Sequence, residues 1–368
     1  MVTRAGRWPE PGEQLSVQAC WIAEVMLQQT QLRVMRPYWR RWMEAFPDRA
    51  TLAAAPPDQV LLVWQGLGYY SRARRLQQAA QQLEERAAVT GAPWPQDLAD
   101  WLALPGLGRT TAAGILSSAF DAPEAILDGN VKRVLARLLA CPTPPARAGA
   151  LFWSWSDTLL DPARPRDFNQ ALMDLGATVC TPRAPACERC PWRPWCAAYA
   201  AGTVDRYPVK ADRRPVPHHV VGVGVVFNER REVLIDQRLD EGLLGGLWEF
   251  PGGKQEPGEA IEATIVRELR EELAIEVDVA EPLIELDHAY SHKRLRFLVH
   301  LCRWRSGVPR PLASQQVRWV AVSELERYPF PAANSRIIAA LRDWLAAAEP
   351  GWFRVAPAGS SPVLPLEP

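Results

Sequence analysis

The spacing of apolar residues divides the chain into a helical part and a part rich in strands. Over residues 15–200 apolar positions recur at intervals of three and four, and Ala, Leu, Gln and Arg are frequent, which predicts a mainly helical region. From His219 short valine-rich runs such as 220–227 and 232–235, with a turn around Asn228, predict strands. The sequence therefore predicts an all-α domain followed by a mixed α/β domain.

Breaks in this pattern predict the domain boundaries, and a chain of 368 residues is long enough for two domains. We expect a helical domain over 1–202, a proline-spaced charged linker over 203–217, an α/β domain over 218–348 and a disordered Pro, Ala, Gly and Ser-rich tail over 349–368. Further predicted elements are strands at 295–303 and 317–320 and helices at about 259–273 and 335–347.

Composition changes this picture only slightly. The 42 basic and 42 acidic residues give a net charge of zero, but residues 1–210 hold 23 Lys and Arg against 19 Asp and Glu. That excess neither favours nor opposes a nucleic-acid partner. No apolar run is long enough to cross a bilayer and residues 1–11 carry no signal segment, so we expect a cytoplasmic protein, at the nucleoid when it acts, with no membrane partner.

Seven cysteines without an export signal favour metal binding over disulfides. Four of them follow the spacing C-x6-C-x2-C-x5-C, namely Cys180, Cys187, Cys190 and Cys196. Four thiolates within one short loop can close around a metal centre at little entropic cost. By ligand chemistry alone, an iron–sulfur cluster and a structural zinc ion fit equally well. The other cysteines, Cys20, Cys141 and Cys302, are expected to be ordinary buried thiols.

A glycine hairpin and an aspartate form a second motif. The segment L-P-G-L-G at 104–108 ends one helix and starts another, and Gly106 and Gly108 allow backbone N–H groups to approach a phosphate. The next residues, Arg109 and Thr110, begin the new helix, whose N-terminus favours an anion. We therefore predict a DNA backbone contact at this hairpin.

Glu24 is the only carboxylate between Glu13 and Glu44. At helical spacing it shares a face with Val17, Cys20 and Leu27, and an apolar face raises the pKa of a carboxyl group. A pKa near neutrality suits a general acid. The alternative is a buried glutamate paired with an arginine.

These motifs together resemble the MutY-type adenine DNA glycosylases of the helix-hairpin-helix superfamily. The resemblance rests on W-I-A-E-V-M-L-Q-Q-T-Q around Glu24, on the hairpin followed twenty residues later by Asp128, and on the cysteine loop. It implies that Glu24 protonates N7 of adenine and that Asp128 supports the positive sugar. It also implies that Asn130 hydrogen-bonds near the abasic sugar and that the four cysteines hold one 4Fe–4S cluster.

The same resemblance implies how DNA is held and cut. Thr110 stands where strand-cleaving relatives have a lysine nucleophile, so a monofunctional glycosylase without Schiff-base chemistry is expected. Gln28 and Tyr70 match the residues that enter the duplex beside the lesion, whereas we expect Tyr69 in the core. Residues 7–10 resemble the family's L-P-W-R segment only weakly, so no adenine-binding residue is assigned before Glu24.

The second domain contains a box that resembles the Nudix box. It runs from Gly253 through Glu259 to R-E-L-R-E-E-L-A at 267–274, with Ala274 where the consensus has glycine. Three carboxylates at i, i+3 and i+4 on one helical face, those of Glu268, Glu271 and Glu272, could hold Mg2+ against a diphosphate. The alternative is a solvated glutamate-rich helix.

A segment at 290–292 resembles the loop with which this family recognises oxidised guanine, with tyrosine replacing phenylalanine. Ser291 and His292 are suited to hydrogen-bond N7–H and O8 of the lesion; a polar hairpin turn is the alternative. The expected partner is double-stranded DNA with adenine opposite 8-oxoguanine or guanine, bound by a monomer. Two other hypotheses stay open: a Nudix hydrolase of oxidised nucleotides carried on a DNA-binding module, and a non-catalytic lesion sensor.

Overall fold

The computed structural model describes residues 13–210, 217–242, 244–289 and 294–347. They form two compact units: one contains the described residues of Met1–Ala55 and Arg72–Arg214, and the other those of Pro56–Ser71 and Pro215–Pro368. Residues 56–71 thus group with the C-terminal unit, and the predicted domain boundaries stay a prediction. The limits of the linker and the tail stay a prediction.

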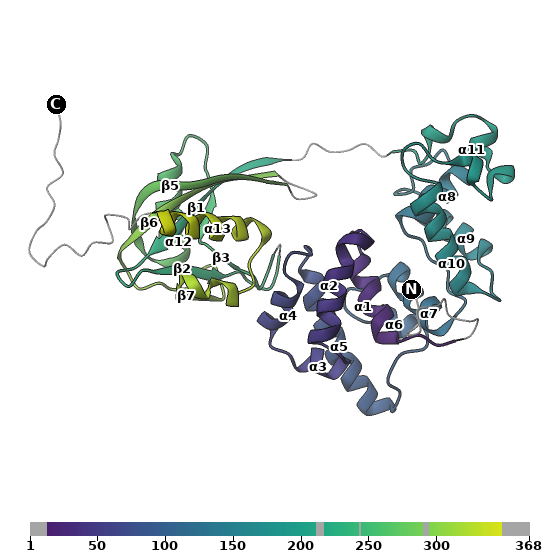
Figure 1. The fold of residues 1–368 in the computed structure, drawn as a ribbon, viewed down its shortest axis with the longest axis horizontal. Coiled ribbons are helices and arrows are strands. Elements are labelled where there is room, and N and C mark those ends of the chain that lie inside the picture. Colours follow the sequence, from purple (N-terminus) through teal and green to yellow (C-terminus); the bar gives the residue numbers. More distant parts are fainter. Residues whose placement is uncertain (1–12, 211–216, 243, 290–293, 348–368) are drawn as a thin grey trace, which may run out of the picture. The chain divides into compact units, whose positions relative to one another are not determined.

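The first unit is helical (Figure 1). Its α-helices are α1 (Val17–Leu27), α2 (Leu32–Ala45), α3 (Arg49–Ala54), α5 (Ser71–Thr90), α6 (Leu98–Leu102), α7 (Arg109–Phe120), α8 (Gly129–Leu138), α9 (Gly149–Leu159), α10 (Pro165–Asp174) and α11 (Ala197–Ala200). A π-helical turn, η1 (Leu175–Val179), and three 3-10 turns, η2 (Cys187–Arg189), η3 (Arg193–Trp195) and η4 (Val204–Arg206), complete it.

Local sequence explains where the key helices begin and how they are held. The Ser16 hydroxyl accepts a hydrogen bond from the Ala19 amide at the start of α1, which satisfies one free N–H of the first turn. Trp21 of α1 is fully buried and its ring lies 5.9 Å from that of Trp94 in an edge-on contact. Buried side chains of α7, α8, α9 and α10 share a second cluster that includes Ile126, Leu135 and Phe152.

The second unit is a mixed sheet with helices. Its elements are α4 (Pro57–Trp64), β1 (His218–Phe227), β2 (Glu232–Gln237), β3 (Trp248–Glu249), β4 (Gly252–Lys254), α12 (Ile261–Leu273), β5 (Glu276–Ala289), β6 (Arg294–Ser306), β7 (Gln316–Ala321), η5 (Val322–Arg327) and α13 (Ala332–Ala347). The strand order is β3-β2-β1-β6-β5, with β4 paired to β1 and β7 paired to β2. The central pair, β1 and β6, is parallel, and the other pairs are antiparallel.

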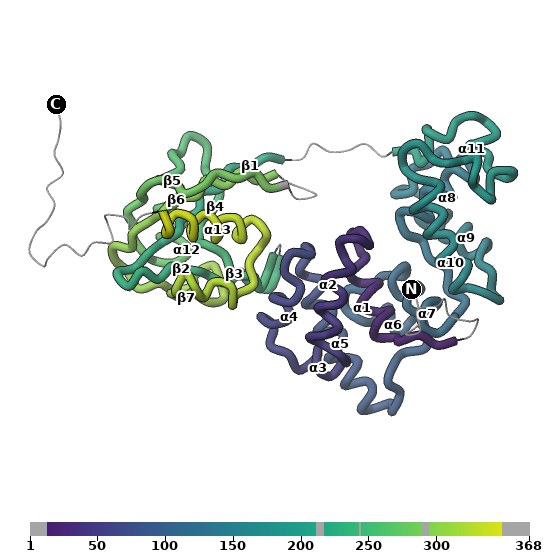
Figure 2. Tube along the Cα trace, viewed as in Figure 1, coloured from purple at the N-terminus to yellow at the C-terminus, as the bar shows by residue number. Residues whose placement is uncertain are grey.

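Alternate residues of β1 bury opposite faces of this sheet. Val225 and Phe227 pack in a cluster with Ile337 and Leu341 of α13, whereas Val226 packs in a separate cluster with Leu269 of α12. Side chains along a strand alternate between faces, so one strand contributes to both cores. Figure 2 follows the chain as a tube through these strands to α13. The sheet is thereby covered by one helix on each face.

The predicted fold class, an all-α region followed by a mixed α/β domain, is confirmed. The long strand β5 was not predicted, and neither were the short strands β3 and β4. Residues 203–210, expected to be linker, include η4, and the Tyr207 carbonyl accepts a hydrogen bond from Arg137. In the described part of the chain, no helix combines the length and apolar character needed to span a membrane.

Candidate active site

Glu24 lies on α1, which packs against α7. A Cβ atom placed on Gly114 of α7 would lie 2.7 Å from Oε2 of Glu24. The missing side chain at Gly114 therefore makes room for the carboxyl group against the α7 backbone. Gly114 was not among the predicted site residues; the only signal for it is a glycine inside an otherwise helical run.

The surroundings of Glu24 disfavour its charged form. Burial raises its pKa from 4.5 to about 7, and the nearby charge of Asp128 adds to the increase. A pKa near neutrality leaves both the protonated and the ionised form of this carboxyl group accessible at neutral pH. A group with this pKa can donate a proton and still be reprotonated from water.

Asp128 occupies a different environment, at the N-cap of α8. Its Oδ1 accepts a hydrogen bond from the Val131 amide at 2.7 Å, and its other oxygen accepts one from the Asn130 side chain at 3.0 Å. The free N–H groups of a helix N-terminus stabilise negative charge. The two carboxyl groups that the sequence predicted are thus placed in one unit, one by an apolar helix face and one by a helix N-terminus.

Asn130 is held in turn by Arg133. The Arg133 guanidinium donates to Oδ1 of Asn130 at 2.9 Å, to the Gly176 carbonyl at 2.7 Å and to the Cys180 carbonyl at 2.8 Å. A Cβ atom on Gly176 would lie 2.6 Å from that of Asn130, so η1 and α8 approach closely here. Arg133 was missed by the sequence analysis because its role depends on this approach.

The hairpin has the predicted form at its glycines. Gly106 has φ +79° and a Cβ atom there would lie 2.9 Å from Arg75, while Gly108 is the N-cap of α7. Thr110 donates to the Leu127 carbonyl at 3.1 Å, one residue before Asp128. The charge of Arg109, which we predicted to contact DNA, is engaged by Asp157.

Two neighbouring glutamines, Gln28 and Gln29, follow the end of α1 and lie in different environments. Gln28 donates to Oγ1 of Thr111 at 2.9 Å and to the Gly106 carbonyl at 3.3 Å, so its amide is tied to the hairpin. Gln29 is exposed and has φ +58°, a left-handed conformation that is costly for a residue with a Cβ atom. Arg72 holds this turn by donating to the carbonyls of Val25, Met26 and Gln28.

The tyrosine pair lies in the C-terminal unit of the structure. Tyr70, which we predicted to enter the duplex, is 3% exposed, and its hydroxyl contacts the Gly66 amide at 3.1 Å and the Phe330 carbonyl at 3.3 Å. Tyr69, which we expected in the core, is 45% exposed with φ +49°. The expectation for Tyr69 is wrong, because its side chain is exposed at the surface.

The four predicted cysteine ligands line one cavity of about 30 Å³. Burial and the neighbouring thiols raise the pKa of Cys187, whereas Arg137 lowers it. Across the described ranges, no three His, Cys, Asp or Glu side chains are placed to hold a metal ion. The four thiols nevertheless border one common cavity.

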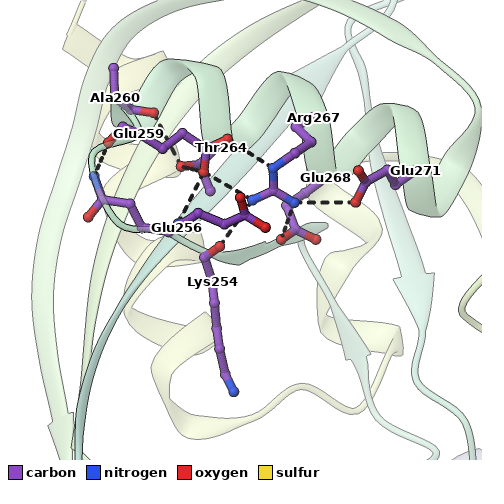
Figure 3. Close-up of polar contacts among 9 residues, drawn as sticks. Lys254, Glu256, Glu259, Ala260, Thr264, Arg267, Glu268 and Glu271 are labelled. Carbon is purple, nitrogen blue, oxygen red and sulfur yellow. Dashed lines mark hydrogen bonds and ion pairs between the residues drawn. The ribbon is translucent and has the colours of Figure 1, made fainter.

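In the C-terminal unit, Arg267 organises the Nudix-like box (Figure 3). It donates to Glu259 at 2.9 Å, to Glu268 at 2.9 Å and to Glu271 at 3.3 Å. The hydrogen bonds from Arg267 and Thr264 lower the pKa of Glu259 to about 2. Two of the three carboxylates predicted to hold Mg2+ are therefore paired with an arginine, and of these Glu268 is largely buried whereas Glu271 is exposed.

Two acids outside the box lie near its third carboxylate. Asp236 of β2 is directly opposite Glu249 of β3, is 5% exposed, and its Oδ1 has no hydrogen-bond partner among the described residues. Burial raises the pKa of Asp236 well above 3.8, with further increases from Glu249 and Glu272. Burial and Glu268 raise the pKa of Glu272 to about 7. Asp236 and Glu249 could not be predicted from the sequence, because only strand pairing brings them together.

The predicted lesion-recognition residues Ser291 and His292 lie outside the described residues, between the ends of β5 and β6. Ala289 and Arg294, on either side of them, are register partners in the β5–β6 pair.

Comparisons with known proteins agree with both units. The model of the HhH-GPD superfamily of base excision DNA repair proteins matches residues 22–155, and that of the NUDIX domain matches residues 222–340. Among solved structures, a thermostable thymine-DNA glycosylase is 26% identical with a TM-score of 0.47, over 50% of this chain and 85% of that one.

Relatives of known activity match over most of the sequence. The adenine DNA glycosylase of Rattus norvegicus is 34% identical over 365 residues, which cover 87% of this chain and 70% of the relative. The adenine DNA glycosylase of Homo sapiens is 33% identical over 370 residues, with coverage of 87% and 67%. With Glu24, Asp128 and the cysteine loop in place, the chain belongs to the adenine DNA glycosylase family.

Proposed function

We propose that this protein is a monofunctional adenine DNA glycosylase in base excision repair, and that it removes adenine opposite 8-oxoguanine or guanine in duplex DNA. One observation carries the proposal: Glu24 has a pKa of about 7, raised first by burial and then by Asp128, which caps α8. Cleavage of a glycosidic bond uses a neutral carboxylic acid together with an ionised carboxylate, and Glu24 and Asp128 supply this pair in the proposal.

In the proposed reaction, Glu24 donates its proton to N7 of adenine, so that the base leaves as a neutral molecule. The anionic Asp128 stabilises the positive charge that develops on the sugar, and Asn130 keeps the Asp128 carboxylate in position. Thr110 carries no amine, so no Schiff base with the sugar forms and the DNA strand stays intact. Water completes the hydrolysis.

The DNA contacts are proposed at the hairpin and at the end of α1. Gly106, Gly108 and the N-terminus of α7 would hold a phosphate, with Arg109 and Thr110 beside it. We propose Gln29, with Gln28 anchoring the turn, as the side chain that fills the gap beside the extruded base, since Gln29 is exposed. For Tyr70 the same role requires the tyrosine to leave its buried position.

We further propose that Cys180, Cys187, Cys190 and Cys196 hold one 4Fe–4S cluster, and that Ser291 and His292 recognise the oxidised guanine. Bound at the four thiolates, the cluster would supply a rigid cross-link for the loop 180–196. Visible absorbance from thiolate-to-iron charge transfer, together with iron and sulfide analysis, tests this part. A colourless, zinc-loaded protein would contradict it.

The activity is tested by single-turnover release of adenine from a duplex with one adenine opposite 8-oxoguanine. We expect Glu24→Gln to abolish release while duplex binding survives, and Glu44→Gln, an exposed acid on α2, to behave as the unaltered protein. Release by Glu24→Gln at the unaltered rate would overturn the assignment. Binding without any release by the unaltered protein would instead identify a lesion sensor.

A second candidate function is hydrolysis of oxidised nucleoside triphosphates, with Mg2+ at Glu268, Glu271 and Glu272. The ordered box around Arg267 favours it, whereas the bonds of Glu268 and Glu271 to that arginine oppose it. The test is pyrophosphate release from 8-oxo-dGTP with Mg2+. Release that disappears in Glu271→Gln but not in Glu262→Gln, an exposed acid on the same helix, would establish this activity.

A further inference from the structure

Arg137 carries a positive charge into the interior of the first unit. It lies in the last turn of α8 and is 2% exposed. An arginine stays protonated in proteins, and burying its charge is costly unless polar or charged partners replace water. The identity of those partners therefore indicates what the residue is for.

The hydrogen bonds of Arg137 all go to the cysteine loop and the segment after it. It donates to the carbonyls of Tyr207 at 3.0 Å, Thr181 at 2.7 Å and Pro182 at 3.4 Å, and to Sγ of Cys180 at 3.4 Å. The Arg137 carbonyl in turn accepts from Sγ of Cys196 at 3.5 Å. No carboxylate among the described residues forms an ion pair with it.

Carbonyl groups solvate a guanidinium but do not neutralise its charge. Among the described residues that line the same cavity as Arg137, the groups that can become anionic are the four cysteine thiols and the Tyr199 hydroxyl, which donates a hydrogen bond to Glu188. Arg193 also lines this cavity, but it is paired with Glu188 and its side chain is 41% exposed. Of the two arginines that line the cavity, Arg137 is therefore the one whose positive charge can be balanced by the thiolates.

We propose that Arg137 is the internal counter-charge of the metal centre at these cysteines, and that it raises the reduction potential of that centre and slows its loss. The proposal rests on the cluster assigned under the proposed function. A cube with four thiolate ligands carries net negative charge, and reduction makes it more negative. A fixed positive charge beside it therefore favours the reduced form.

The test compares the cluster in three variants by spectroelectrochemistry without DNA. We expect Arg137→Gln to raise the oxidised-to-reduced ratio at a fixed potential on the order of tenfold, equivalent to about 59 mV for a one-electron couple. Arg137→Lys keeps the charge and should stay near the unaltered protein. Arg189→Gln removes an exposed charge of the same loop that does not line the cavity, and should change little.

Cluster retention supplies a second readout for variants that assemble poorly. Visible absorbance during incubation with ferricyanide should decay several-fold faster in Arg137→Gln than in Arg137→Lys. Equal potentials and equal decay for Arg137→Gln and the unaltered protein would overturn the proposal. So would equal effects of the Gln and Lys variants, which would assign Arg137 a packing role. An unaltered protein without iron would instead refute the cluster itself.

Discussion

At the scale of single residues, the two carboxyl groups of the site differ in environment rather than in kind. Glu24 packs against Gly114 in an apolar helix contact, and Asp128 accepts hydrogen bonds at a helix N-terminus. Burial disfavours charge on the first, while N–H donors stabilise charge on the second. This difference in environment supports the proposed roles of Glu24 as proton donor and Asp128 as anion.

The pKa of Glu24 leads to a prediction for the pH dependence of the reaction. The proposed mechanism requires the protonated form of Glu24, whose pKa is about 7. The single-turnover rate of adenine release should therefore fall with rising pH above about 7, approaching tenfold per pH unit. Rates measured from pH 5.5 to 9 on one duplex check this. A rate that stays constant from pH 7 to 9 would contradict the role of Glu24 as acid.

Gly114 leads to a prediction about the position of the Glu24 carboxyl group, whereas the preceding prediction concerns its protonation. The methyl group of Gly114→Ala would lie 2.7 Å from Oε2 of Glu24 and must displace that carboxyl group, so adenine release should slow on the order of 100-fold while the helix remains. Gly149→Ala on α9 is the matched control, because nothing lies within 4 Å of its new methyl group. Similar rates for both variants would show that Glu24 tolerates the shift.

At the scale of elements, the sequence predicts what is local and misses what depends on pairing. Helix α12 follows from the spacing of its apolar and acidic residues, and the hairpin follows from Gly106 and Gly108. Strand β5 was missed because Pro282 and several acids interrupt its apolar pattern, and only pairing with β6 organises it. The orientation of Gln28 and Gln29 depends on the residue where α1 ends, which sequence patterns place poorly.

The C-terminal end of α12 shows why the Nudix consensus has glycine at position 274. Ala274 has φ +57°, so its Cβ atom is strained in the left-handed conformation that ends this helix. Ala274→Gly should therefore raise the free energy of unfolding of the C-terminal unit by about 1 kcal/mol. Denaturant unfolding of the full chain measures it.

The matched control for this prediction is Ala263→Gly, at an exposed position inside the same helix. There glycine only adds flexibility to the unfolded chain, so the free energy of unfolding should fall by about 1 kcal/mol. Opposite signs for the two substitutions would confirm that conformation at residue 274, rather than glycine as such, is decisive. A loss of stability in both variants would contradict it.

At the scale of the whole molecule, a net charge of zero hides two chemically different units. The first holds the predicted acids, hairpin and cysteines, and the second buries several carboxyl groups of its own. Whole-chain composition could not predict the second feature, since Asp236, Glu249 and Glu272 come from separate elements. It does, however, have a consequence for stability.

Glu272 should make the C-terminal unit less stable as the pH rises. Burial and neighbouring acids raise its folded pKa from 4.5 to about 7, so the folded state binds more protons than the unfolded state between these values. The stability present below about pH 4.5 is lost as the pH rises through about 7. Compared with the unaltered protein, Glu272→Gln should have a similar Tm at pH 4.5 and a higher Tm at pH 8.

Scanning calorimetry at several pH values measures this difference, with Glu262→Gln as the exposed control on the same helix. The Tm difference between Glu272→Gln and the unaltered protein should grow with pH, and that of the control should not. A Tm difference between these two proteins that does not depend on pH would show that the negative charge of Glu272 does not destabilise the folded protein.

The burial of the cysteines has a practical consequence for measuring how much of the proposed metal centre is assembled. Three are buried, namely Cys20, Cys141 and Cys302, and four are partly exposed, namely Cys180, Cys187, Cys190 and Cys196. Burial and then Glu24 raise the pKa of Cys20 to about 12, which suppresses its reactive thiolate. Brief alkylation at neutral pH should therefore modify four thiols in metal-free protein and none in loaded protein, as mass spectrometry can count. The stoichiometry of alkylation would thus measure the loaded fraction of a preparation without iron analysis, and a fifth fast thiol would contradict this assignment.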